Sequence, residues 1–158
     1  MAYYSFKLVH LIAVMLFLGN IVTGLFWMRF AVKTMDLNII RHTMKVIIKL
    51  DGYFTVPGVI VITAGGIITA IYGRFPILGT GWILWSIIMF SISGLAFVFK
   101  VVPLQKKLYA MTPESGREPD DFDWGAFKMV YHDWDIWGLI ALLTPLAAFV
   151  MMILKWPH

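Results

Sequence analysis

Hydrophobic positions along the chain form four long stretches without a formal charge. They cover residues 8–28, 52–73, 75–99 and 136–154, and hold 21, 22, 25 and 19 residues. A helix needs about 20 apolar residues to cross the hydrocarbon core of a bilayer, and it satisfies its own backbone hydrogen bonds there. The pattern therefore predicts an all-α integral membrane four-helix bundle. We expect one domain over residues 1–158, with spans at about 8–28, 53–73, 80–100 and 136–154.

A shorter segment between the first two stretches has a two-sided pattern. Over residues 36–50 apolar side chains recur every three or four positions, and polar side chains share the opposite face. This spacing is typical of an amphipathic helix that lies on the membrane interface or continues into it. We therefore expect a cytoplasmic amphipathic helix over about 36–50, between the first and second spans. Attraction to anionic lipid explains its cations more simply than a specific anion site does.

Acidic residues gather in the second long connection, over residues 103–133. This segment contains Pro113, Pro119 and the acidic residues Glu118, Asp120, Asp121 and Asp123, so we expect a loop with hydrated charges. Asp133 and Asp135 would then favour the positive end of the fourth helix, and Asp51 that of the second.

Composition narrows the possible classes of protein. Hydrophobic residues make up 60% of the chain and charged residues 14%, which excludes a soluble globular or a disordered protein. Cysteine is absent, which excludes disulfides, cysteine-ligated clusters and a cysteine nucleophile. A phosphate-binding glycine loop and a Ser/His/Asp arrangement are also absent. The sequence leaves open whether the protein is an enzyme.

The cations are distributed unequally between the two faces of the predicted bundle. Three, Lys7, Arg74 and Lys155, fall on the face that carries both termini. The other ten fall on the opposite face: Arg29, Lys33, Arg41, Lys45, Lys49, Lys100, Lys106, Lys107, Arg117 and Lys128. The positive-inside rule places the ten in the cytoplasm, so we expect a bacterial inner-membrane protein with both termini in the periplasm. The inner leaflet accounts for these cations, so lipid and not nucleic acid is the expected partner.

His10 is the clearest ionisable residue inside a predicted span. It is either a neutral histidine bonded to a neighbouring helix, or a ligand to haem iron or copper. Met151 and Met152 end the fourth span near the same depth. A His/Met pair suits haem b or Cu(I), whereas methionine also fills gaps in apolar cores. Both interpretations stay open.

Other residues of the spans are expected to serve packing. Small residues let helices approach closely, a buried amide needs a partner across the bundle or on a ligand, and a mid-helix proline frees a carbonyl. The residues in question are Asn20, Gly24, Gly58, Gly65, Thr69, Gly73 and Pro145.

Four sequence blocks carry a resemblance to a known family. They are H-L-I-A-V-M-L-F-L-G-N-I-V-T-G from His10 to Gly24, D-G-Y-F-T-V-P-G from Asp51 to Gly58, V-P-L-Q from Val102 to Gln105, and W-G at Trp137 and Gly138. With these blocks in this order, the chain resembles the bacterial integral membrane proteins grouped as domain of unknown function 2269. The likeness covers nearly the whole chain.

That family is distantly similar to the membrane domain of copper-resistance proteins of the D type and to the bacterial membrane protoporphyrinogen oxidase. In both, a first-helix histidine is tied to tetrapyrrole or metal handling, and only His10 carries over from this wider likeness. The resemblance implies a haem- or copper-binding module in electron transport or metal handling. The alternative is a non-catalytic accessory subunit of a respiratory or transport complex, packed against partner subunits or further copies of itself. A transporter ranks third, because the sequence shows no broken-helix pair and no carboxylate within a span.

Overall fold

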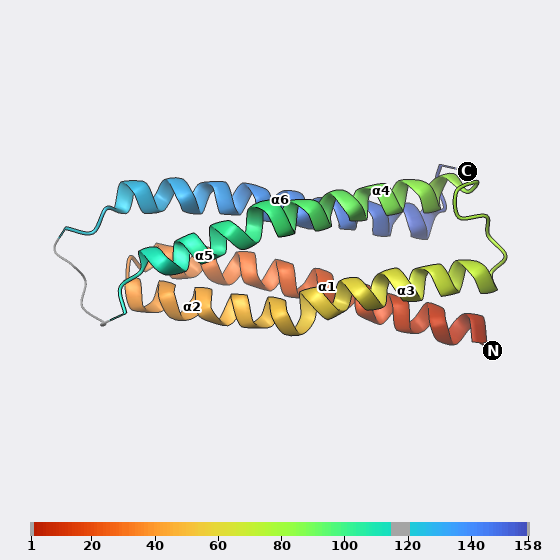
Figure 1. Cartoon of the computed structure of the whole chain (residues 1–158), viewed down its shortest axis with the longest axis horizontal. Helices are drawn as coiled ribbons and strands as arrows, with labels where there is room; N and C mark the ends of the chain where they lie inside the picture. Colours follow the sequence, from red (N-terminus) through yellow and green to blue (C-terminus); the bar gives the residue numbers. More distant parts are fainter. Residues whose placement is uncertain (1, 115–120, 158) are drawn as a thin grey trace.

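The residues that the structure describes, 2–114 and 121–157, form helices and short connections. In this computed structural model the elements are α1 (Ala2–Lys33), α2 (Leu37–Leu50), η1 (Asp51–Thr55), α3 (Val56–Tyr72), α4 (Gly81–Ala96), η2 (Phe97–Val101), α5 (Val102–Met111) and α6 (Trp124–Leu154), where η denotes a π-helical segment (Figure 1). The prediction of an all-α fold is confirmed for this part of the chain. Arg117, Glu118, Pro119 and Asp120 lie outside the described residues.

Four long helices arise because some of these elements follow one another without a break. α2, η1 and α3 form one helix over Leu37–Tyr72, and α4, η2 and α5 form another over Gly81–Met111. Together with α1 and α6 they are four helices of 31 to 36 residues that are long and apolar enough to cross a membrane. Such helices are about 45–55 Å long, whereas the hydrocarbon core is about 30 Å thick. The bundle must therefore extend well beyond the bilayer.

A proline follows each π-helical segment closely. Pro57 and Pro103 have no backbone N–H and cannot donate to the carbonyl four residues earlier. The residue before each proline bonds five residues back instead: Val56 N–H to the Asp51 carbonyl, and Val102 N–H to the Phe97 carbonyl. Both helices therefore accommodate a proline by one wide turn and continue.

The expected amphipathic helix is present, and it is part of the bundle. α2 begins at Leu37 after the Asp36 side chain caps it, and it runs directly into η1 and α3 instead of lying apart on a membrane surface. Its apolar side chains Leu37, Ile40, Met44 and Ile47 are buried in the bundle. An apolar stripe fits a protein core as well as a lipid surface, so periodicity alone could not separate the two.

The second connection is also more helical than expected. Only residues 112–114 and 121–123 of its described part lie outside α5 and α6, so the expected loop over 103–133 was wrong at both ends. α6 begins at Trp124, capped by Asp123, which places Asp133 and Asp135 inside the helix and not at its start.

Burial divides the bundle into two halves. We call residues 29–50, 102–114 and 121–135 the stalk, and residues 2–28, 51–101 and 136–157 the membrane half. Exposed large apolar side chains cover the membrane half. Among the described stalk residues only four such side chains are exposed: Phe30, Met35, Ile39 and Met129. The membrane half therefore has the surface expected of helices in lipid, and the stalk that of a bundle in water.

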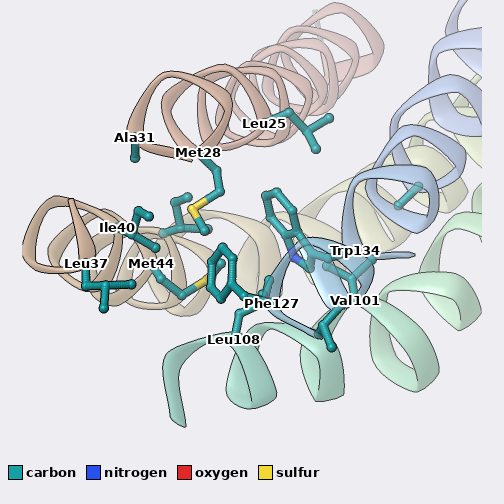
Figure 2. Close-up of a cluster of buried hydrophobic side chains, with 13 residues drawn as sticks. Leu25, Met28, Ala31, Leu37, Ile40, Met44, Val101, Leu108, Phe127 and Trp134 are labelled. Atoms are coloured by element: carbon teal, nitrogen blue, oxygen red, sulfur yellow. The ribbon is translucent and has the colours of Figure 1, made fainter. Parts of the chain in front are cut away.

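The larger hydrophobic core lies mainly in the stalk (Figure 2). Met28, Ile40, Met44 and Phe127 are completely buried in it and bring α1, α2 and α6 together, with Leu108 from α5. The membrane half holds a smaller cluster of Ala13, Phe17 and Ile62. A lipid-facing bundle has less side-chain surface to hide from water, so this unequal division follows from the two solvents.

Towards the end that carries both termini, the helices separate into two pairs. Figure 1 shows α1 with α3 and α4 with α6, the pairs diverging from the middle of the bundle. Gly58 on α3 faces Phe17, and Gly24 on α1 faces Ile47 of α2. Thr69 donates to the Gly65 carbonyl at 2.6 Å, and Gly73 ends α3. Gly58 and Gly24 therefore each meet a side chain of a neighbouring helix, whereas the contacts given for Thr69 and Gly73 lie within α3.

Candidate functional site

A buried polar cluster lies where the stalk meets the membrane half. Its centre is Asp51, which is 8% exposed. Asp51 Oδ1 accepts hydrogen bonds from Asn20 Nδ2 at 2.9 Å and Thr55 Oγ1 at 2.7 Å, and Asp51 Oδ2 accepts one from Gln105 Nε2 at 2.8 Å. Asn20 Nδ2 also donates to Thr55 Oγ1 at 2.9 Å. The cluster therefore joins α1, η1 and α5 through one carboxyl group.

The π-helical segments place these side chains. Asp51 and Thr55 are the first and last residues of η1, so the wide turn carries two members of the cluster. Gln105 lies on α5 just after η2 and Pro103. π-helical turns occur frequently at functional sites, because they redirect side chains without ending the helix. Two such segments near one carboxyl group mark this as the candidate site.

The carboxyl group of Asp51 has no charged partner among the ion pairs of the described residues. Those pairs are Arg29 with Asp135 and Arg41 with Glu114, both of them in the stalk. The neighbours that bond Asp51 are two amides and one hydroxyl, all neutral. A buried carboxylate without a counter-ion is costly, and either a proton or a bound cation relieves that cost.

The predicted role of Asp51 at the start of the second span, where a carboxylate favours the helix dipole, is wrong. Asp51 lies inside a continuous helix. Two signals could have revealed the cluster: Asp51 and Thr55 are four residues apart, and the predicted need of Asn20 for a partner points across the bundle. The contribution of Gln105 could not be foreseen, because it depends on how α5 packs.

A small cavity adjoins the polar cluster. Its volume is about 30 Å³, and Asn20, Asp51, Gln105 and Trp134 line it together with apolar residues of α1, α2, η2 and α6. Trp134 is 2% exposed, and its Nε1 donor has no hydrogen-bond partner. Figure 2 shows the indole entering the core from α6, near Leu25 and Val101. The site thus combines a carboxyl group with an unused donor.

His10, the first candidate from the sequence, lies far from this cluster, on the membrane half of α1. It is 7% exposed, and its Nδ1 lies 2.9 Å from the Ile62 carbonyl of α3. A carbonyl only accepts, so Nδ1 carries the proton and donates, and Nε2 keeps its lone pair. Gly65 and Gly66 make room for the ring: a Cβ on Gly66 would stand 3.1 Å from His10 Cε1.

The structure places the two candidate methionines on the other helix pair. Met151 lines an open apolar groove on α6 with Leu143, Val150 and Trp156, and Met152 is its half-buried neighbour. His10 packs on α3, and Figure 1 shows the α1–α3 and α4–α6 pairs apart near the termini. Within residues 2–114 and 121–157, no three His, Cys, Asp or Glu side chains are grouped as metal ligands.

These observations define an integral membrane protein with four apolar helices and a polar cluster at the base of its membrane half. The chain belongs to the family of predicted integral membrane proteins DUF2269, whose model matches residues 5–156. No curated protein and no solved structure matches the chain.

Proposed function

We propose that this chain is a proton-coupled membrane protein in which Asp51 gains and loses the proton. The observation that carries the proposal is the buried Asp51 carboxyl group, bonded by donors from α1, η1 and α5 and lacking a counter-ion. Ionisable groups at such positions in membrane proteins commonly mark proton or ion pathways. Coupling requires a group that can take up a proton and that also takes part in helix contacts. Asp51 has both properties, because its carboxyl group can ionise and it bonds side chains of α1 and α5.

Protonation changes the hydrogen bonds that the carboxyl group can make. The carboxylate only accepts, which suits the three donors around it. A proton on Oδ2 would occupy the acceptor position that Gln105 Nε2 leaves open, and the neutral carboxyl group would then hold the Gln105 donor more weakly than the carboxylate does. The proton is thereby linked to the contact between η1 and α5.

The two π-helical segments support the same proposal. A transporter ranked third on the sequence alone, because the sequence shows no carboxylate within a span and no pair of broken helices. The structure supplies Asp51 at the end of a span, and π-helical segments at Asp51–Thr55 and Phe97–Val101 in the two middle helices. Each segment is a place where a helix can change its register without unfolding.

Infrared spectroscopy of the protein in liposomes tests the proposal, because a protonated carboxyl group has its own C=O stretching band. We expect the band of one buried carboxyl group to change with pH in the wild type and to be lost in Asp51→Asn. Asp133→Asn is the matched control, since Asp133 is an exposed acidic residue of the same chain. Identical pH-difference spectra for the wild type and Asp51→Asn would overturn the proposal.

A second candidate function is the handling of haem b or copper at His10. The geometry of the ring favours it: Nδ1 donates to the Ile62 carbonyl, the arrangement that orients many metal-ligating histidines and leaves Nε2 free to bind. It is also the role that a resemblance to D-type copper-resistance proteins and membrane protoporphyrinogen oxidase would imply for His10. Purified protein should then show a Soret band or bound copper that His10→Ala removes and His42→Ala retains.

The same purification tests the accessory-subunit alternative. Colourless, metal-free protein that co-purifies stoichiometrically with a respiratory or transport complex supports that role and contradicts haem or copper binding. The broad exposed apolar surface of the membrane half offers area to lipid, to partner subunits and to further copies of the chain. We propose a bacterial inner membrane with both termini in the periplasm, since eight of the ten cations assigned to the cytoplasmic face belong to the stalk. These eight are Arg29, Lys33, Arg41, Lys45, Lys49, Lys106, Lys107 and Lys128.

A further inference from the structure

The Trp134 indole is the one buried side chain of the described residues whose polar atom has no partner. Its Nε1 donor is buried, with the side chain 2% exposed, and Trp134 is one of the residues that line the cavity beside Asp51. An unmade hydrogen bond of this kind destabilises the folded protein, so native proteins usually satisfy such donors with protein or with ordered water. The donor therefore points to an occupant of the cavity.

The size of the cavity limits what can occupy it. A water molecule needs at least about 10–15 Å³ of probe-occupied volume and two to four polar partners. The cavity offers about 30 Å³ with mostly apolar walls, and the polar residues among those that line it are Asn20, Asp51, Gln105 and Trp134. The space suits one or two waters and is far too small for a cofactor.

The chemistry of the lining selects among species of this size. Trp134 Nε1 requires a hydrogen-bond acceptor, which a bare metal cation or an ammonium ion does not provide. Asp51 has about four acceptor positions on its two oxygens, of which three are used by Asn20, Thr55 and Gln105. The remaining position accepts a donor. Water supplies a lone pair for Trp134 Nε1 and a proton for the free position of Asp51. A cation interacts favourably with Asp51 but offers no acceptor to Trp134 Nε1.

We infer that the cavity holds a buried water molecule that accepts a hydrogen bond from Trp134 Nε1 and donates one to the Asp51 cluster. This water links α6 to the carboxyl group that α1, η1 and α5 already share. The inference deepens the proposed function, since the water gives the Asp51 proton a neighbour to move to. It does not require that function, because a water can fill the cavity in a protein that never exchanges the proton.

Nuclear magnetic resonance detects such a water directly. In protein labelled with ¹⁵N at the indoles, Trp134→Phe identifies the Trp134 Nε1 signal by its disappearance. We expect a nuclear Overhauser effect between the Trp134 Nε1 proton and water, although the side chain is 2% exposed. The indole of Trp82, in the membrane half, serves as the reference for exchange-relayed signals. Absence of the effect at Trp134 overturns the inference.

An isosteric replacement gives a second, independent readout. Incorporating β-(3-benzothienyl)alanine at position 134 exchanges the indole N–H for sulfur and keeps the shape of the ring. If water accepts the N–H, the replacement should raise the equilibrium constant for unfolding roughly five- to tenfold, the cost of one lost hydrogen bond. The same replacement at Trp85, which is 45% exposed, is the control and should have no such effect. A neutral or stabilising result at position 134 also overturns the inference.

The two proposals fail separately. In Asp51→Asn the amide still offers hydrogen-bonding atoms, so the water signal at Trp134 should persist while the infrared response to pH disappears. A pH-dependent Asp51 band without the water signal would contradict the buried water and leave proton binding intact. The water signal without a pH-dependent band would contradict proton binding at Asp51 and support the buried water.

Discussion

Ser93 on α4 donates a hydrogen bond to the Ala141 carbonyl on α6, with 2.7 Å between Ser93 Oγ and the carbonyl oxygen. Ala141 lies four residues before Pro145, which is buried within α6 and has no N–H to offer that carbonyl. The hydroxyl of one helix therefore satisfies the acceptor that a proline has freed in another. The sequence predicted the free carbonyl at Pro145, and the structure identifies its donor.

Removing this hydroxyl tests how much the α4–α6 contact contributes to stability. We expect Ser93→Ala to lower the free energy of unfolding by about 1 kcal/mol, since interhelical hydrogen bonds in membranes contribute about 0.6 kcal/mol on average and up to about 1.7 kcal/mol. Equilibrium unfolding in mixed micelles measures the change.

Ser91→Ala is the matched control, because Ser91 is exposed on the same helix two residues earlier. It should leave stability unchanged within about 0.5 kcal/mol. An equal loss in both variants would mean that the Ser93 bond contributes nothing specific.

Gln105→Met should destabilise the protein through the Asp51 cluster. Methionine keeps the length and much of the volume of glutamine, but it removes the donor to Asp51 Oδ2. A hydrogen bond to a charged group contributes about 1.5–3 kcal/mol, so a loss of this order is expected at a pH where Asp51 is ionised. Equilibrium unfolding again provides the measurement.

A double-mutant cycle with Asp51→Asn separates this effect from general repacking. In the Asp51→Asn background the charge is gone, and Gln105→Met should cost at least about 0.5 kcal/mol less than in the wild type. Lys106→Met, at the exposed neighbouring position, should show no coupling to Asp51. Strictly additive losses at positions 51 and 105 would contradict the arrangement of the cluster.

Gly65 permits the close approach of α3 to α1 at His10. A Cβ at Gly65 would stand 3.3 Å from His10 Cβ, so the branched side chain in Gly65→Val must push the two helices apart. We expect a loss of about 1–3 kcal/mol, the usual cost of overpacking.

Gly19→Val is the comparison, because a Cβ at Gly19 meets nothing within 4 Å. Both substitutions place a β-branched residue within a lipid-facing helix, and only one of them meets a neighbour. If Gly19→Val is as harmful as Gly65→Val, helix packing at His10 is not the cause.

The absence of cysteine allows a direct test of membrane orientation. Single cysteines at Tyr3 and Trp156 should both react with an impermeant thiol reagent added from the periplasmic side, since both termini lie at one end of the bundle (Figure 1). A cysteine at the exposed stalk position Lys45 should react only after the membrane is opened. Labelling of Lys45→Cys from the periplasmic side of intact membranes would show that the topology is the opposite of the predicted one.

The long helices were predictable because their cause is local. A run of about 20 residues without charge has few alternatives to a membrane-spanning helix. The carboxyl group at Asp51 was misread for the same reason: seen along the sequence, it borders the apolar stretch at residues 52–73, as an aspartate at a helix start would. Its burial depends on Asn20 and Gln105, which are 31 and 54 residues away in the chain.

For His10 the sequence predicted the position along the helix but not the hydrogen-bond partner. Its depth in the first span was predictable, but its bond to the Ile62 carbonyl depends on how α1 and α3 pack. The haem or copper role of His10 stays a prediction. A metal site needs further ligands, and an equal depth in the membrane does not show that two side chains are close together. Met151 had the right depth in the sequence, yet it lies on the diverging α4–α6 pair.

By itself the sequence determined the solvent of each segment. The charge-free stretches indicate which segments lie in lipid, and the amphipathic pattern over 36–50 indicates which residues of that segment avoid water. Only the tertiary structure decided that α2 joins the bundle instead of a membrane surface, and that one carboxyl group joins three helices. The physical reason is that hydrophobicity has no direction, whereas a hydrogen bond requires two particular atoms to meet, and residues far apart in the chain meet only in the folded bundle.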